Sequence, residues 1–325
     1  MLYNKLTGTD LKVSEVGFGL WTLSTSGWSS GNREEGSVNL IRSAFDVGVT
    51  LFDTADSYSK GYSEELLFES LGSVRKEIVI STKLGFDFYP PDIEFVKSLG
   101  SHKPEKNFEP DYIAFACEQS LKRLNTDYID LLSLHYPTVS DAEQDYVFEQ
   151  LERLVEDGKI LHWGAALDDL ENSEELVEIL INDRESAFLH IPCNIFEKGI
   201  LDMVSQCSEE ESVGIISRRP HFYGFLESDT ANDIELLLSE DSHSYIDNLP
   251  NGAGRRLEQC AEFIRICSVF GVAPNYAAMR YVLDIPAVCV TIPNIRDMKT
   301  LVDFCVDFDS DALPPELTEA LIDLF

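Results

Sequence analysis

Eight short apolar or β-branched segments recur along this chain, and most are followed by a longer segment whose apolar residues have helical spacing. Repeated strand-then-helix units predict a parallel sheet, because each helix returns the chain to the edge where the next strand begins. Eight units in 325 residues favour a closed (β/α)8 barrel, the TIM barrel, over two domains. We therefore expect one domain over residues 1–325. The expected strands are 15–21, 49–54, 77–83, 128–135, 160–165, 187–191, 213–217 and 287–292.

Helical patterns fill the intervals between these strands, with polar caps or glycine near their ends. They are expected at 36–47, 63–71, 111–124, 142–157, 172–182, 255–270 and 276–283. Residues 1–14 lie outside the repeat and contain a Thr7-Gly-Thr-Asp10 turn between two short apolar segments, which predicts a β-hairpin that closes the bottom of the barrel. Two connections, 85–110 and 218–254, are too long for simple turns, and we expect them to be active-site loops.

The charge of the chain restricts its partners. Lys and Arg number 25 against 58 Asp and Glu, a formal net charge of −33, so long-range repulsion opposes binding to nucleic acid or to anionic membranes. No stretch has the length and apolarity of a membrane span, and the N-terminus lacks the pattern of a signal peptide. The seven cysteines are scattered without a C-x-x-C pair, so neither a disulfide framework nor a metal cluster is indicated. We expect a cytoplasmic protein.

Ionisable side chains stand at the ends of three consecutive predicted strands: Asp53, with Tyr58 shortly after it, then Lys83, then His135. Each has an ordinary structural explanation taken alone, such as a helix cap, loop packing or a buried histidine. Together they indicate catalysis, since a lysine at a buried strand end needs a carboxylate partner and Asp53 lies on the adjacent strand. We expect the cation to lower the pKa of Tyr58 and make it a general acid, with His135 orienting a carbonyl oxygen and no metal required.

These residues lie in segments that resemble the aldo-keto reductases, (β/α)8 barrels that reduce aldehydes and ketones with NADPH. The resemblance implies that Tyr58 is the acid, Lys83 tunes it, Asp53 holds Lys83 and His135 orients the carbonyl. The similar segments include Val13-Ser-Glu-Val-Gly-Phe-Gly19, Asp53-Thr-Ala-Asp-Ser-Tyr58, Ser81-Thr-Lys83, Leu134-His-Tyr-Pro137, Gly158-Lys-Ile160 and Val290-Thr-Ile-Pro293.

The segments that bind the nicotinamide in that family depart from its pattern. Where the family usually has Gly-Val-Ser-Asn, whose Ser and Asn bind the carboxamide, this chain reads Gly164-Ala-Ala-Leu167. The family's glutamine on the sixth strand aligns with His190, which replaces one polar contact out of three. We expect these changes to weaken the hold on the nicotinamide and, with it, hydride transfer.

The adenosine end of the cofactor site is kept in part. The segment Ile292-Pro-Asn294-Ile-Arg296 resembles the family's phosphate-binding segment, which implies that Arg296 grips the 2′-phosphate of NADPH. The family's adenine-contacting Glu-Asn stands here as Asp303-Phe304. The resemblance also places Arg218 near the cofactor, whereas a surface ion pair explains Arg218 and Arg219 equally well. Trp21 is equally plausible as a wall of the pocket and as a plug of the barrel.

The predicted function is reduction of a small-molecule carbonyl with NADPH, with NADH as the other cofactor to consider. Two alternatives stay open. The first is a regulatory or sensor barrel that binds the cofactor with little turnover, and the second is a non-redox isomerase or dehydratase on the same fold. Neither the individual carbonyl substrate nor the oligomeric state follows from the sequence.

Overall fold

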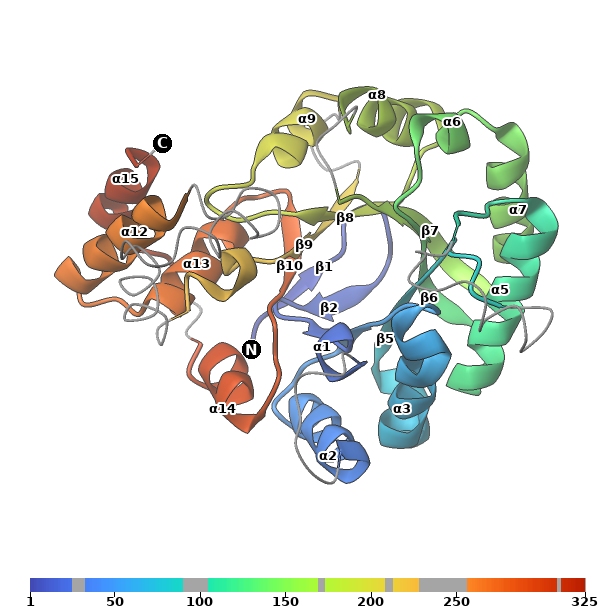
Figure 1. Ribbon diagram of the computed structural model, residues 1–325, viewed down its shortest axis with the longest axis horizontal. Helices are drawn as coiled ribbons and strands as arrows, with labels where there is room; N and C mark the ends of the chain where they lie inside the picture. The colour runs from blue at the N-terminus through green and yellow to red at the C-terminus, as the bar shows by residue number, and fades with distance from the viewer. Residues whose placement is uncertain are drawn as a thin grey trace, which may run out of the picture.

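Eight parallel strands, each hydrogen-bonded to the next along the chain, form the centre of the protein. The computed structural model describes residues 1–24, 33–89, 105–168, 173–207, 213–227, 256–308 and 311–324. A parallel bridge between Val16 and Thr291 joins the first strand segment to the last, so the sheet closes into a barrel (Figure 1). The strands are β3 (Phe18–Gly19), β4 (Leu51–Asp53), β5 (Val79–Leu84), β6 (Ile129–His135), β7 (Ile160–Ala166), β8 (Phe188–Pro192), β9 (Gly214–Arg218) and β10 (Val288–Ile292).

The barrel register aligns the strand ends that matter for a site. Asp53 on β4 pairs with Ser81 on β5, and His135 on β6 pairs with Ala166 on β7, which in turn pairs with His190 on β8. All residues of β5 and β6 are buried, as expected for strands covered on one face by helices and on the other by the barrel interior. The expected (β/α)8 barrel is confirmed, with strand bounds within three residues of those predicted.

Helices cover the outside of the barrel in the order of the chain (Figure 1). Two predicted helices differ from the structure: 142–157 is two helices, because Gln144 is extended between them, and 172–182 ends in a π-helical turn, η3 (Ile179–Asp183). Among the described residues, no helix is long and apolar enough to cross a membrane. The helices are α1 (Trp21–Ser24), α2 (Arg33–Asp46), α3 (Tyr62–Leu71), α5 (Pro110–Leu124), α6 (Val139–Ala142), α7 (Asp145–Glu156), α8 (Ser173–Glu178), α9 (Gly199–Cys207), α12 (Leu257–Val269), α13 (Pro274–Leu283), α14 (Met298–Leu301) and α15 (Pro315–Ile322).

The N-terminal hairpin closes the barrel at the end where the strands begin. Strands β1 (Tyr3–Lys5) and β2 (Lys12–Ser14) pair antiparallel, and Leu6, fully buried, packs in one cluster with Leu51 and Leu131 from the starts of β4 and β6. Gly8 has φ +75, and a Cβ there would lie 2.1 Å from the carbonyl oxygen of Ala187. This position therefore requires glycine for its backbone conformation and for its close contact. The predicted hairpin is confirmed.

The two long connections are described only in part. Residues 90–104 and 228–255, which make up most of the predicted loops 85–110 and 218–254, lie outside the described residues. In the described parts, Phe86 forms an isolated bridge with Lys106, and a short 3-10 turn, η4 (Phe222–Gly224), follows β9. Two predictions remain untested: that these connections are active-site loops, and that residues 1–325 form one domain.

Candidate active site

Lys83 and Asp53 form a buried ion pair at the carboxyl ends of β4 and β5. The Nζ atom of Lys83 donates to both carboxylate oxygens of Asp53, at 2.6 and 2.7 Å, and to the carbonyl oxygen of Thr54 at 2.7 Å. Ser81 Oγ donates to Asp53 Oδ1 at 2.9 Å. Every proton of the ammonium therefore has an acceptor, which is what a lysine with no solvent exposure requires.

Tyr58 and His135 lie next to this pair. Tyr58 begins a short 3-10 turn, η1 (Tyr58–Gly61), after β4, and its ring centroid is 5.5 Å from Lys83 Nζ and 6.0 Å from the ring centroid of His135. His135 ends β6 and is buried, and its Nδ1 has no hydrogen-bond partner among the described residues. The structure thus brings the four predicted catalytic residues together.

The charge balance around Tyr58 differs from the expectation. Burial, and next the negative charge of Asp53, raise the pKa of Tyr58 well above its ordinary value. The sequence predicted a lowered pKa because Lys83 is cationic, but Asp53 neutralises that charge at 2.6 Å. The predicted direction is wrong for the protein without cofactor. Tyr58 is therefore protonated at neutral pH and holds a proton that it can donate.

His135 is uncharged in the same environment. Burial, followed by the positive charges of Lys83, Lys106 and Arg218, lowers the pKa of His135 well below its ordinary value. The imidazole at neutral pH therefore has one N–H donor and one acceptor nitrogen. A neutral ring suits a residue that orients a carbonyl oxygen by hydrogen bonding without competing with Tyr58 as an acid.

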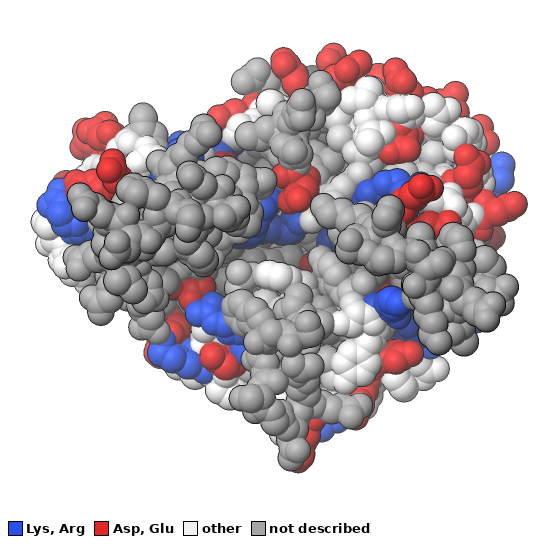
Figure 2. All heavy atoms as spheres, in the orientation of Figure 1, with Lys and Arg blue, Asp and Glu red and all other residues white. Residues whose placement is uncertain are grey.

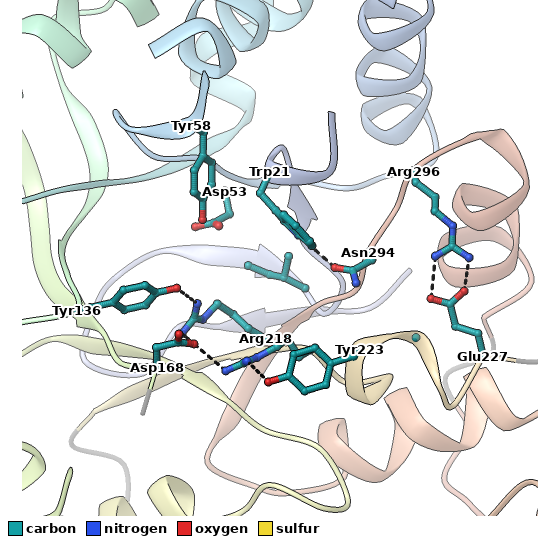
Figure 3. Close-up of a pocket in the computed structure, with 13 residues that line it drawn as sticks. Trp21, Asp53, Tyr58, Tyr136, Asp168, Arg218, Tyr223, Glu227, Asn294 and Arg296 are labelled. Carbon is teal, nitrogen blue, oxygen red and sulfur yellow. Dashed lines mark hydrogen bonds and ion pairs between the residues drawn. The ribbon is translucent and has the colours of Figure 1, made fainter. Parts of the chain in front are cut away.

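A cavity of about 410 Å³ opens beside Tyr58 at this end of the barrel. Figure 3 shows Tyr58 and Asp53 on one side of it, Tyr136, Asp168, Arg218 and Tyr223 across from them, and Arg296 with Glu227 at its far end. The last residues of β4, β9 and β10 and the segments that follow β3, β4, β6, β7, β9 and β10 supply the lining, so the cavity lies at the carboxyl ends of the strands. The lining residues are Trp21, Asp53, Tyr58, Tyr136, Asp168, Arg218, Arg219, Tyr223, Gly224, Glu227, Ile292, Asn294 and Arg296.

Five of the seven predicted cofactor contacts line this cavity: Trp21, Arg218, Ile292, Asn294 and Arg296. Trp21 Nε1 donates to Asn294 Oδ1 at 3.1 Å, which joins the loop after β3 to the loop after β10.

The other two predicted contacts, His190 and Asp303, are not among the lining residues. His190 is fully buried, with its Nε2 at 3.1 Å from Ser81 Oγ. Asp303 pairs with Lys299 at 3.3 Å on the outer surface. That His190 and Asp303 contact a cofactor therefore stays a prediction.

Arg296 is engaged by a carboxylate. Its Nη1 donates to Glu227 Oε1 at 2.8 Å, and its Nη2 donates to the other oxygen, so the pair is bidentate. The Glu227 side chain is only 7% exposed to solvent. A 2′-phosphate at Arg296 would therefore have to share or displace this carboxylate, which bears directly on the choice between NADPH and NADH.

Sequence reasoning did not predict Tyr136, Asp168 and Glu227 as site residues. Tyr136 and Asp168 each follow a barrel strand by one or two positions, so the strand-end rule that selected Asp53 and His135 could have found them. The backbone gives a second signal, since Tyr136, Arg219 and Tyr223 have φ near +60 and all line the cavity. Non-glycine residues in this strained region concentrate at functional sites.

One end of the cavity carries an excess of positive charge, although the lining as a whole balances three arginines against three carboxylates. Figure 2 shows Lys and Arg side chains beside acidic ones in the hollow near the centre of this face, while Asp and Glu predominate among the charged side chains visible at its rim. At the Tyr58 end, Arg218 and Arg219 share the one carboxylate of Asp168, at 3.8 and 2.7 Å. This local excess of positive charge favours a ligand with acceptor or anionic groups.

The fold is thus a (β/α)8 barrel with a cavity at the carboxyl ends of its strands, where enzymes of this architecture keep their active sites. The chain belongs to the aldo/keto reductase family, whose model matches residues 15–313. It is 29% identical over 218 residues to aldo-keto reductase YhdN of Bacillus subtilis, covering 66% of this chain and 60% of the relative. It is 28% identical over 246 residues to L-glyceraldehyde 3-phosphate reductase of Escherichia coli, covering 72% and 65%. The matches therefore span less than two thirds of the length of these curated relatives.

Solved structures agree on the fold over the whole chain. An aldo-keto reductase from Bacillus halodurans, 23% identical, superposes with a TM-score of 0.80 over 100% of this chain and 96% of that one. Glycerol dehydrogenase from Gluconobacter oxydans, 24% identical, superposes with a TM-score of 0.77 over 99% and 94%. At these identities the likeness concerns the fold.

Proposed function

We propose that this protein reduces an aldehyde or ketone to the alcohol with a nicotinamide cofactor, and that NADPH is the preferred one. The observation that carries the proposal is the protonated Tyr58 beside the buried Lys83–Asp53 pair, at the edge of a cavity that takes a small molecule. Support comes from relatives, since one is named as a reductase of L-glyceraldehyde 3-phosphate and two solved structures from Klebsiella pneumoniae are complexes with NADP or NADPH.

The lining of the cavity fits a nicotinamide cofactor. The Nε atoms of Arg218 and Arg219 are buried without a hydrogen-bond partner among the described residues, and an amide or phosphate oxygen would satisfy them. Arg218, Ile292, Asn294 and Arg296 would hold the cofactor, as the family resemblance implies, and Trp21 would form a wall of its site. When bound, the cofactor supplies the hydride that the carbonyl carbon accepts.

Side chains of the protein supply the proton that the carbonyl oxygen receives. Tyr58 gives its phenolic proton to the carbonyl oxygen as negative charge develops there, and His135 orients that oxygen by hydrogen bonding. The raised pKa of Tyr58 keeps the donor protonated until reaction. Lys83 stands 5.5 Å from the ring centroid, and Asp53 fixes its position and offsets much of its charge. The phenolate that forms is stabilised by what remains of that charge and by Arg218, which acts to lower the pKa of Tyr58.

The test is oxidation of NADPH, followed at 340 nm, with a panel of aldehydes and ketones, and with Tyr58→Phe as the matched control. We expect steady turnover in the wild type and a loss of roughly 10²-fold in the variant. Tight cofactor binding without consumption would point to a sensor barrel instead. Conversion of a substrate without net oxidation of the cofactor would point to an isomerase or dehydratase.

A further inference from the structure

The positions that would bind the nicotinamide carboxamide by resemblance to the family present no polar side chain to the cavity. Ala166 and Leu167 are buried and apolar, and His190 is fully buried in the barrel interior, with Nε2 engaged by Ser81 and Nδ1 without a partner among the described residues. None of the three lines the cavity beside Tyr58. The amide group of a nicotinamide has a carbonyl acceptor and an NH2 donor, and leaving either without a partner in a closed site is costly.

The carboxamide has to lie close to Tyr58. Hydride transfer requires the transferring ring carbon within about 3–3.5 Å of the carbonyl carbon, whose oxygen meets the Tyr58 hydroxyl. The carboxamide sits on the neighbouring ring carbon, so its partners must be polar groups at the Tyr58 end of the same cavity. Figure 3 places Tyr136, Asp168 and Arg218 there, with Arg296 and Glu227 at the other end.

Arg218 offers a fixed donor. Its Nη1 donates to Tyr136 Oη at 3.0 Å and its Nη2 donates to the carbonyl oxygen of Leu167, so two hydrogen bonds hold the plane of the guanidinium. Its Nε is buried and has no partner among the described residues. Burial of an unpaired N–H is unfavourable, and it indicates a ligand acceptor at this point.

Asp168 offers the matching acceptor. Its Oδ1 accepts from Arg219 Nη2 at 2.7 Å and lies 3.8 Å from Arg218 Nη2, which aligns the carboxylate beside the guanidinium. The side chain remains 41% exposed and lines the cavity, so lone pairs of the carboxylate are open to it. Arg219 in turn donates to Tyr223 Oη at 2.6 Å, which fixes the whole cluster.

We propose that Arg218 and Asp168 together bind the nicotinamide carboxamide, with Arg218 donating to its oxygen and Asp168 accepting from its NH2 group. This inference rests on the proposed function, because it assigns residues to the cofactor of that reaction. The two charged groups replace the three neutral side chains of the family pattern. The hold on the nicotinamide is therefore relocated to the loop after β7 and the carboxyl end of β9, and this replaces the expectation that it is weakened.

Two cofactors that differ at this one group test the inference. NADP⁺ and 3-acetylpyridine adenine dinucleotide phosphate share the carbonyl oxygen, but the analogue has a methyl group in place of NH2. Dissociation constants are measured by calorimetry, without any substrate. We expect the wild type to bind NADP⁺ about tenfold more tightly than the analogue, the effect of one hydrogen bond to a charged acceptor. Asp168→Ala should reduce the ratio to within about twofold, and Asp168→Asn, which keeps an acceptor, should restore part of it.

Two further variants separate the roles of the charged groups. Arg218→Leu should weaken both cofactors about equally, by tenfold or more, and leave their ratio unchanged, because both retain the oxygen. Glu227→Ala removes the carboxylate at the other end of the cavity and should also leave the ratio unchanged.

The outcomes distinguish this inference from the proposed function. A wild type that oxidises NADPH but binds the two cofactors equally well overturns the inference and leaves the function standing. If Asp168→Ala tightens both cofactors by the same factor, Arg218 and Arg219 bind an anionic group, Asp168 only neutralises them, and the inference fails. A wild type that binds neither cofactor overturns both.

Discussion

The two sides of the cavity differ in the residues they contain and in the roles we assign to them, proton delivery on one side and cofactor binding on the other. Around Tyr58, the buried Lys83–Asp53 pair is saturated with hydrogen bonds and follows the sequence pattern of the family. Across the cavity, the family's neutral carboxamide partners are replaced by Ala166 and Leu167, and charged groups with unsatisfied donors stand nearby. Proton delivery tolerates little change because it depends on one group in one protonation state. Holding an amide can be done by any rigid donor and acceptor pair.

The largest effect is expected from removing one partner of the buried ion pair on the catalytic side of the cavity. Lys83→Met leaves Asp53 buried without a counter-ion, so we expect a loss of about 3–5 kcal/mol in the free energy of unfolding. Chemical denaturation measures it. The double variant with Asp53→Leu removes the unpaired charge and should regain most of that stability while remaining inactive. Recovery of activity in the double variant would show that the pair serves the fold only.

A pair of tyrosines then separates the two sides. Tyr58→Phe removes the acid, so kcat should fall roughly 10²-fold while NADPH affinity stays within about twofold. Tyr136→Phe removes only an acceptor of Arg218, so it should weaken cofactor binding a few-fold with a smaller effect on kcat. Steady-state rates and calorimetric affinities check both variants. Equal loss of kcat in the two would contradict the division between proton delivery and cofactor binding.

The third prediction concerns the far end of the cofactor side, where Glu227 engages Arg296. Glu227→Gln frees the guanidinium for a 2′-phosphate, so the preference for NADPH over NADH should rise by about tenfold. Dissociation constants for both cofactors measure it. Asp284→Asn, which breaks an arginine–carboxylate pair with Arg280 away from the cavity, is the control and should leave the preference unchanged. If Glu227→Gln instead favours NADH, Arg296 does not bind the phosphate.

Restoring the family pattern tests the relocated carboxamide site. Relocation predicts that Ala166→Ser, Leu167→Asn and His190→Gln together give no gain and change NADPH affinity by less than about threefold. The reason is that positions 166, 167 and 190 are buried away from the cavity, and that the His190→Gln substitution removes the contact between His190 and Ser81. Calorimetry on the folded triple variant decides it. Tighter binding with faster turnover would support weakened contacts at the family's positions.

The smallest effect is expected from pH. His135 has a pKa well below its ordinary value and Tyr58 one well above, so neither group changes protonation between pH 6.5 and 9. Lys106, whose pKa burial lowers to about 8, does lose its charge in this range, but burial is the larger cause that keeps His135 neutral. At saturating cofactor, kcat/KM for a neutral aldehyde should vary by less than about twofold over that range. An acid limb near pH 6.5 would mean that His135 titrates and that its surroundings are less apolar than the structure indicates.

Much of the fold was accessible from periodicity, because buried parallel strands are continuous apolar runs and their helices have a regular apolar face. Helices α1, α9 and α15 were not predicted, and α1 has only four residues, too few for a helical pattern to develop. The strand-end rule identified Asp53, Lys83 and His135, and motif resemblance gave their roles. The direction of the Tyr58 pKa was wrong because sequence does not give the relative weight of Lys83, Asp53 and burial.

The sequence by itself determined the barrel, the hairpin that closes it and the four residues at the strand ends, because these follow from local patterns and from the order of strands. Only the tertiary structure decided what lies beside them. Arg218 ends β9, Tyr136 and Asp168 follow β6 and β7, and Arg296 meets Glu227 across 69 positions of chain. Such contacts depend on loop conformation and on the closure of the sheet, which bring together residues that no local pattern relates.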